Sequence, residues 1–173
     1  MNAMHVASEL TLYTVVAVAV LQDLQFMKIS NRLILAGLVL SLVFGIILGR
    51  TSQILYILGN IFFPVIVLYL LYLLGVLGAG DIKLFSVIGG FTQFHTLVDC
   101  MLFAFMAAAL LSVVKLLCNR NLKSSLAQAF LYMQGLMQGD IRSYRTVREE
   151  KNLIHFSVAI LIGLLIAKGK CCL

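Results

Sequence analysis

Gly78-Ala79-Gly80-Asp81-Ile82-Lys83 stands between two long apolar runs of this chain. A second aspartate, Asp23, follows the first apolar run of the sequence. Desolvating a carboxylate at membrane depth costs free energy, so ionisable residues at such positions are candidates for function. Two carboxylates at comparable depth favour chemistry in which a proton is shared between them.

The composition is that of an integral membrane protein. Hydrophobic residues make up 62% of the 173 positions and charged residues 12%, whereas soluble domains have roughly half and a quarter. A membrane-spanning helix needs about 20 mostly apolar residues, and several segments have that length. We therefore expect an all-α integral membrane protein that forms one domain over residues 1–173.

Apolar runs separated by polar residues predict about six transmembrane helices. They cover Met4–Gln22, Leu33–Gly49, Ile54–Leu74, Asp81–Phe94, Leu97–Leu117 and Leu153–Ala167. The fourth segment is short for a span, so it begins before Asp81 or tilts against its neighbours. The polar segment 119–152 has apolar residues at helical spacing. It predicts a cytoplasmic amphipathic helix between the fifth and sixth spans, with a plain linking helix as the alternative.

Basic residues give the expected orientation. Most of them fall in loops on one side of the predicted bundle, and the other side keeps Arg50, Lys168 and Lys170. The positive-inside rule then places the N-terminus outside, and Asp23 and Asp81 both at cytoplasmic helix ends. The net charge of +6 comes with a mixed-sign polar loop, which favours contact with lipid head groups and not with nucleic acid.

Each aspartate also has a plain structural explanation. Asp23 could pair with Lys28 or Arg32 at the end of its helix, and Asp81 could cap the helix that it begins. Capping does not explain the glycines of Gly78-Ala79-Gly80, which permit close backbone approach and conformations that other residues avoid. An extended substrate laid beside the carboxylates needs such an approach. Together the two sites predict an Asp23/Asp81 pair that activates water for peptide hydrolysis.

No cofactor or metal is expected. The cysteines, Cys100, Cys118, Cys171 and Cys172, form no CxxC pair with zinc-site spacing. The histidines, His5, His95 and His155, are scattered at span ends and are expected to be structural. Asp99 falls on the outer side, away from the other two aspartates. Lys83 points to a different helix face from Asp81 and either reaches the head groups or holds substrate.

These residues together resemble the type IV prepilin peptidases, a family of membrane aspartyl proteases. Gly78 to Lys83 matches the GxGDxK pattern of that family, and Asp23 with the downstream Ile29-Ser30-Asn31 resembles its first aspartate motif. Ile154-His155-Phe156 resembles a further element, although Ser30 and His155 stand where the family usually has proline. The resemblance implies that Asp23 and Asp81 are catalytic.

The same resemblance implies the substrate and the residues that bind it. Prepilins have a basic leader, a glycine before the cut and an apolar helix with a glutamate near its start. Gly78, Gly80, Lys83 and Asn31 are the expected substrate-binding residues. The chain has no paired CxxC motifs of a methyltransferase region, so it resembles the short form associated with Flp-type pili or with archaeal-style filaments. A multi-pass protein of the inner membrane, cleaving at its cytoplasmic face, is expected.

Three other functions remain as alternatives. A presenilin-like protease would need its first aspartate inside a longer span. A small transporter or proton-relay protein would use the same carboxylates to move ions. A non-catalytic assembly subunit would tolerate the loss of both carboxylates.

Overall fold

The computed structural model describes residues 3–48, 54–74, 76–118 and 156–171, and all of the regular structure in these ranges is helical. The helices are α1 (Ala3–Phe26), α2 (Asn31–Ile47), α3 (Ile54–Leu73), α4 (Ala79–Phe91), α5 (Phe94–Cys118) and α7 (Phe156–Cys171). Each of the six segments predicted as spans therefore overlaps a helix, although α4 ends at Phe91 and not at Phe94. Residue 49 and residues 153–155 of the predicted segments lie outside the described residues. The predicted amphipathic helix over 119–152 lies outside the described residues.

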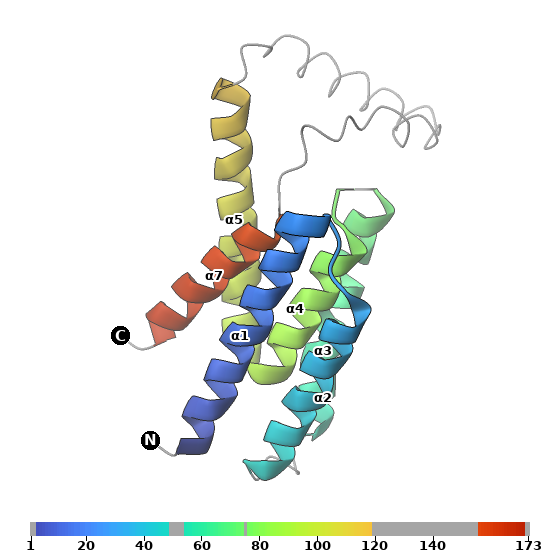
Figure 1. The fold of residues 1–173 in the computed structure, drawn as a ribbon, viewed down its shortest axis with the longest axis vertical. Coiled ribbons are helices and arrows are strands. Elements are labelled where there is room, and N and C mark those ends of the chain that lie inside the picture. Colours follow the sequence, from blue (N-terminus) through green and yellow to red (C-terminus); the bar gives the residue numbers. More distant parts are fainter. Residues whose placement is uncertain (1–2, 49–53, 75, 119–155, 172–173) are drawn as a thin grey trace. The chain divides into compact units, whose positions relative to one another are not determined.

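The chain divides into two compact units. One comprises Met1–Ala107 with His155–Leu173, and the other comprises Ala108–Ile154. In the first unit α1 packs against α2, α4 and α7, while α3 and α2 pack against α4. Figure 1 shows that α1 and α3 run in one direction through this unit and that α2 and α4 run in the other.

Three stretches have the length and composition of membrane spans. Among the described helices they are α1, α3 and the Phe94–Val114 part of α5. Large apolar side chains are exposed on these helices, as at Leu55, Ile66 and Leu110, which suits surfaces that face lipid. α2 has 17 residues, α4 has 13 and α7 has 16, so a full crossing by these shorter helices stays a prediction.

The short helix α4 lies at the centre of the first unit. Eight of its 13 residues are buried, and Leu84, Phe85, Val87 and Ile88 have no exposed surface. Thirteen residues rise only about 20 Å, compared with about 30 Å of bilayer hydrocarbon. α4 is therefore a core helix surrounded by longer ones.

Glycines on α4 allow its neighbours to approach closely. A Cβ atom on Gly89 would collide with the backbone carbonyl of Asn60 in α3, and one on Gly90 would collide with Ser41 in α2. On α2, a Cβ atom at Gly37 would lie 2.9 Å from Val87 Cγ1. The helix continues through Gly89 and Gly90 to Phe91, and both glycines are packing positions.

Substituting Gly89 tests this packing. We expect Gly89→Ala to destabilise the protein by about 1–3 kcal/mol, since the added methyl group meets backbone that cannot move aside. Thermal unfolding of the detergent-solubilised protein measures the effect. Gly59→Ala is the matched control, because Gly59 is a helical glycine with no atom within 4 Å of its would-be Cβ. Equal melting temperatures for the two variants would contradict the packing role.

Candidate active site

The carboxylate of Asp23 lies in the last turn of α1 and is half-buried. Its Oδ2 accepts a hydrogen bond of 2.6 Å from the hydroxyl of Ser157 in α7. The helix ends at Phe26. The N–H of the next residue, Met27, donates to the Asp23 carbonyl at 2.9 Å, and Met27 has φ 51°. This is the left-handed residue that commonly ends an α-helix.

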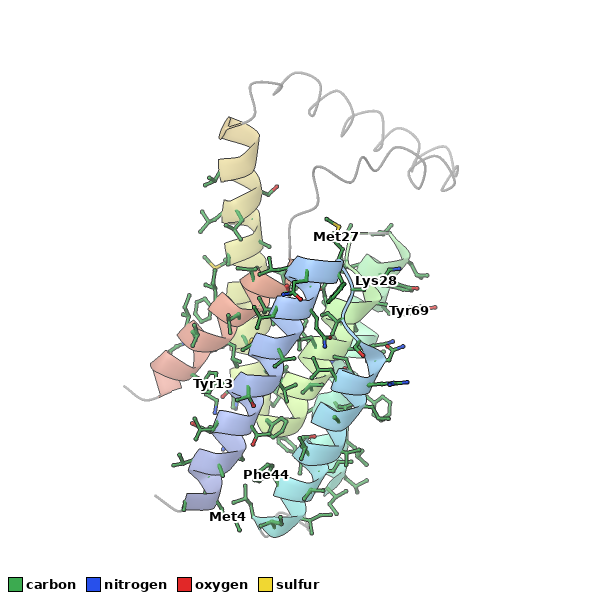
Figure 2. All side chains as sticks on the ribbon, viewed as in Figure 1. Met4, Tyr13, Met27, Lys28, Phe44 and Tyr69 are labelled. Carbon is green, nitrogen blue, oxygen red and sulfur yellow. The ribbon has the colours of Figure 1, made fainter. Side chains whose placement is uncertain are left out.

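The turn between α1 and α2 is held by side chains. The Ser30 N–H donates to Gln22 Oε1 at 3.0 Å, which joins the start of α2 to the residue before Asp23. Ile29 in the same turn lies against Gly80 of α4. Figure 2 shows Met27 and Lys28 of this turn at one end of the first unit, with Met4 and Phe44 at the other. We call the end with the α1–α2 turn and the starts of α4 and α7 the aspartate end.

Asp81 is the third residue of α4 and is half-buried. The helix begins after Gly78, whose φ of −77° and ψ of 148° are open to any residue. The expectation that this glycine supplies an unusual backbone conformation is therefore wrong. What Gly78 supplies is space, because a Cβ atom there would lie 3.1 Å from Asp81 Oδ2. At Gly80 a Cβ atom would make ordinary contact with Ile29, at 3.4 Å or more.

Lys83 and Asn31 are brought together at the aspartate end. Lys83 Nζ donates to Asn31 Oδ1 at 2.9 Å, and both side chains are exposed. The contact joins the first turn of α2 to the start of α4. Two of the four residues predicted to bind substrate are thus neighbours on the surface of this end, where Lys83 donates to a side chain of the protein.

An aromatic cluster joins the start of α7 to the face of α4 that carries Asp81. Phe85 lies four residues after Asp81, so the two side chains share one face of α4. The Phe85 and Phe156 rings have centroids 6.2 Å apart, and Phe156 also contacts Phe105 of α5 at 5.5 Å. Ser157, which bonds Asp23, follows Phe156 directly in sequence.

Helix ends also set the electrostatics of the two aspartates. The C-terminal end of α1 carries partial negative charge, which disfavours the Asp23 carboxylate. The start of α7 carries partial positive charge and lies beside that carboxylate through Ser157. Asp81 lies in the first turn of α4, where the partial charge is also positive. Asp81 therefore lies at the positive end of its own helix, whereas Asp23 lies at the negative end of α1 and beside the positive end of α7.

The other acidic side chains of the described region belong to the opposite end of the first unit. Lys168 pairs with Glu9 at 2.6 Å and Lys170 with Asp99 at 3.2 Å. Lys168 and Glu9 line a cavity of about 280 Å³ there, together with Ser41, Gly90 and Thr92 among others. The helical rise places Glu9 about 20 Å from Asp23 along α1. This cavity is therefore remote from both candidate carboxylates.

One contact of the site was not foreseen from the sequence. Cys100 is buried in the core. The described residues hold no cluster of three or more side chains that could bind a metal, while His155 and Cys172 lie outside those residues. Sequence reasoning missed Ser157. It is an uncharged residue 134 positions from Asp23, and nothing in the sequence pattern indicates that the two side chains meet.

Comparison with known families decides the class of the protein. The type IV leader peptidase family matches residues 10–113, which is more than half of the chain. The chain belongs to this family. It is therefore an aspartic peptidase with membrane helices, of the prepilin peptidase type. Comparison with curated proteins and with solved structures gave no match.

Gly78→Ala tests the need for space beside Asp81. We expect the leader-cleavage rate to fall about tenfold, since even a sub-ångström displacement of a reacting group is costly. The measurement is the initial rate of prepilin cleavage by purified protein in detergent.

Gly169→Ala is the control, because Gly169 lies near the far end of α7 with no atom within 4 Å of a would-be Cβ. This variant should cleave at the wild-type rate. A wild-type rate for Gly78→Ala as well would show that the carboxylate tolerates the added methyl group.

Proposed function

We propose that this peptidase removes the leader peptide of prepilin-like or Flp-type substrates, with Asp23 and Asp81 as its catalytic pair. Family membership supports the activity. The assignment of Asp23 and Asp81 as the catalytic pair is supported by the Ser157–Asp23 hydrogen bond and by the Phe156–Phe85 contact beside it. These contacts tie Asp23 to the helix face that carries Asp81.

The proposed reaction uses two carboxylates that share one proton. The ionised carboxylate takes a proton from a water molecule, whose oxygen attacks the carbonyl carbon of the scissile peptide bond. The protonated carboxylate donates its hydrogen to the carbonyl oxygen as the tetrahedral intermediate forms. When the C–N bond breaks, the proton taken from water passes to the leaving amine. As the carbonyl group of the new carboxylic acid forms, a hydroxyl of the intermediate returns its proton to the second carboxylate, and both carboxylates regain their starting state.

The substrate is proposed to lie along the aspartate end. Gly78 is exposed beside Asp81, and Gly80 lies two positions further on, so an extended peptide can come close to the backbone there. Lys83, held by Asn31, presents a positive charge on the same surface. That charge suits the glutamate that follows the cut in prepilins better than it suits the basic leader.

The proposed orientation places this end at the cytoplasmic face of the inner membrane, with the N-terminus outside. The distribution of basic residues supports it, since Lys28, Arg32 and Lys83 all lie at or near the aspartate end. We further propose that the chain acts as the short form of the family and cleaves without N-methylation. The lipid bilayer and the prepilin are its proposed partners.

Replacing either aspartate tests the catalytic pair. We expect Asp23→Asn and Asp81→Asn each to lower prepilin cleavage at least 1,000-fold, since neither variant can share the proton. Mass spectrometry of a co-expressed prepilin with a basic leader measures processing. Asp99→Asn is the matched control, because Asp99 pairs with Lys170 at the opposite end, and it should process the substrate normally.

The same variants separate a peptidase from an ion carrier. Reconstituted vesicles that carry protons in an Asp23-dependent manner and leave prepilin uncut would favour the transporter. Normal processing by Asp23→Asn or Asp81→Asn would remove the pair from the mechanism.

A further inference from the structure

Ser157 uses its hydroxyl differently from the other buried serines of the described helices. Ser41 donates to the Leu38 carbonyl at 2.7 Å and Ser86 to the Ile82 carbonyl at 3.2 Å, each within its own helix. Such bonds to the preceding turn are the ordinary solution for serine in a helix. Ser157 has no exposed surface, and its hydroxyl donates to a carboxylate on another helix.

The position of Asp23 explains why this donor matters. A carboxylate in the last turn of a helix faces the carbonyl ends of that helix, which repel negative charge. Hydrogen bonds to a charged acceptor are shorter and stronger than neutral ones, and the Ser157–Asp23 distance of 2.6 Å is at the short end for hydroxyl donors. The bond therefore offsets an unfavourable placement and holds the side chain in one orientation.

The donor itself is on a rigid element. Phe156 lies between the Phe85 and Phe105 rings, and a Cβ atom at Gly163 would lie 2.6 Å from the Ala104 backbone nitrogen. α7 is thus packed closely against the first turns of α5, and its start cannot shift without disturbing the core. A group held in this way can orient another side chain accurately.

We propose that Ser157 is a positioning residue that orients Asp23 as the base of the catalytic pair. Oδ2 of Asp23 accepts a hydrogen bond from the Ser157 hydroxyl. Such a bond is strongest when the acceptor is ionised, so we assign to Asp23 the role of the group that takes the proton from water. Asp81 then holds the shared proton and donates to the substrate carbonyl. This assignment rests on the proposed function, since it divides the roles within the Asp23/Asp81 pair.

Kinetics distinguish orientation from a general structural role. We expect Ser157→Ala to lower kcat about 10- to 100-fold with KM unchanged within twofold, because the reacting carboxylate is misplaced while the substrate surface is intact. Ser157→Thr keeps the hydroxyl and should recover most of kcat. Ser86→Ala removes an equally buried hydroxyl, one that bonds only its own helix, and should stay within twofold of wild type. Equal losses in Ser157→Ala and Ser86→Ala, or full kcat in Ser157→Ala, would overturn the proposal.

A measurement without substrate tests the contact itself. In protein labelled with ¹³C at the aspartate carboxyl carbon, the Asp23 resonance is identified by its absence from Asp23→Asn. We expect Ser157→Ala to move that resonance and to leave the Asp99 resonance in place. An unmoved Asp23 resonance would overturn the proposal whether or not Ser157→Thr folds.

The two measurements also separate this proposal from the proposed function. A wild-type protein that leaves prepilin uncut, or a fully active Asp23→Asn, refutes the catalytic pair and with it the positioning role. An active wild type, an inactive Asp23→Asn and a fully active Ser157→Ala refute the positioning role alone.

Discussion

The burial of α4 is the constraint on which the rest of the first unit depends. A helix end leaves backbone groups unpaired, and within a membrane each of them must find a partner. α4 ends among its neighbours, where Asn60 Nδ2 donates to the Thr92 carbonyl at 3.2 Å and the Thr92 N–H donates to Ile88. Glycines at 89 and 90 let α3 and α2 come close enough for this. With its C-terminal end fixed, the start of the helix and Asp81 are fixed as well.

A second constraint is the placement of Asp23, which explains why the start of α7 packs beside the end of α1. A carboxylate at the end of α1 opposes the dipole of its own helix. The start of α7 supplies the opposite dipole end and a hydroxyl donor to the same group. Phe156 secures that start against α4 and α5. The packing of α7 and the electrostatic environment of Asp23 therefore depend on each other. A change that displaces the start of α7 also removes the hydroxyl donor from Asp23.

The helices could be predicted because long apolar runs mark where a membrane protein forms helices. The residues at which the helices end could not be predicted in this way. α1 continues to Phe26, past the predicted end at Gln22, because a left-handed Met27 and not a loss of hydropathy ends it. The aspartates were found from the cost of a carboxylate in an apolar setting. Ser157 was missed because the cost of placing Asp23 is visible in sequence, whereas the group that offsets it is a small neutral residue far along the chain.

Asp23, Glu9 and Asp99 each have a side-chain partner in the first unit. At the opposite end Glu9 and Asp99 are each paired with a lysine. Ser157 is a neutral donor, so it orients Asp23 without adding a positive charge. A carboxylate that must accept a proton and later release it benefits from orientation more than from neutralisation, because a full ion pair resists protonation. The hydroxyl of Ser157 therefore gives Asp23 the fixed orientation that a proton-transferring carboxylate requires.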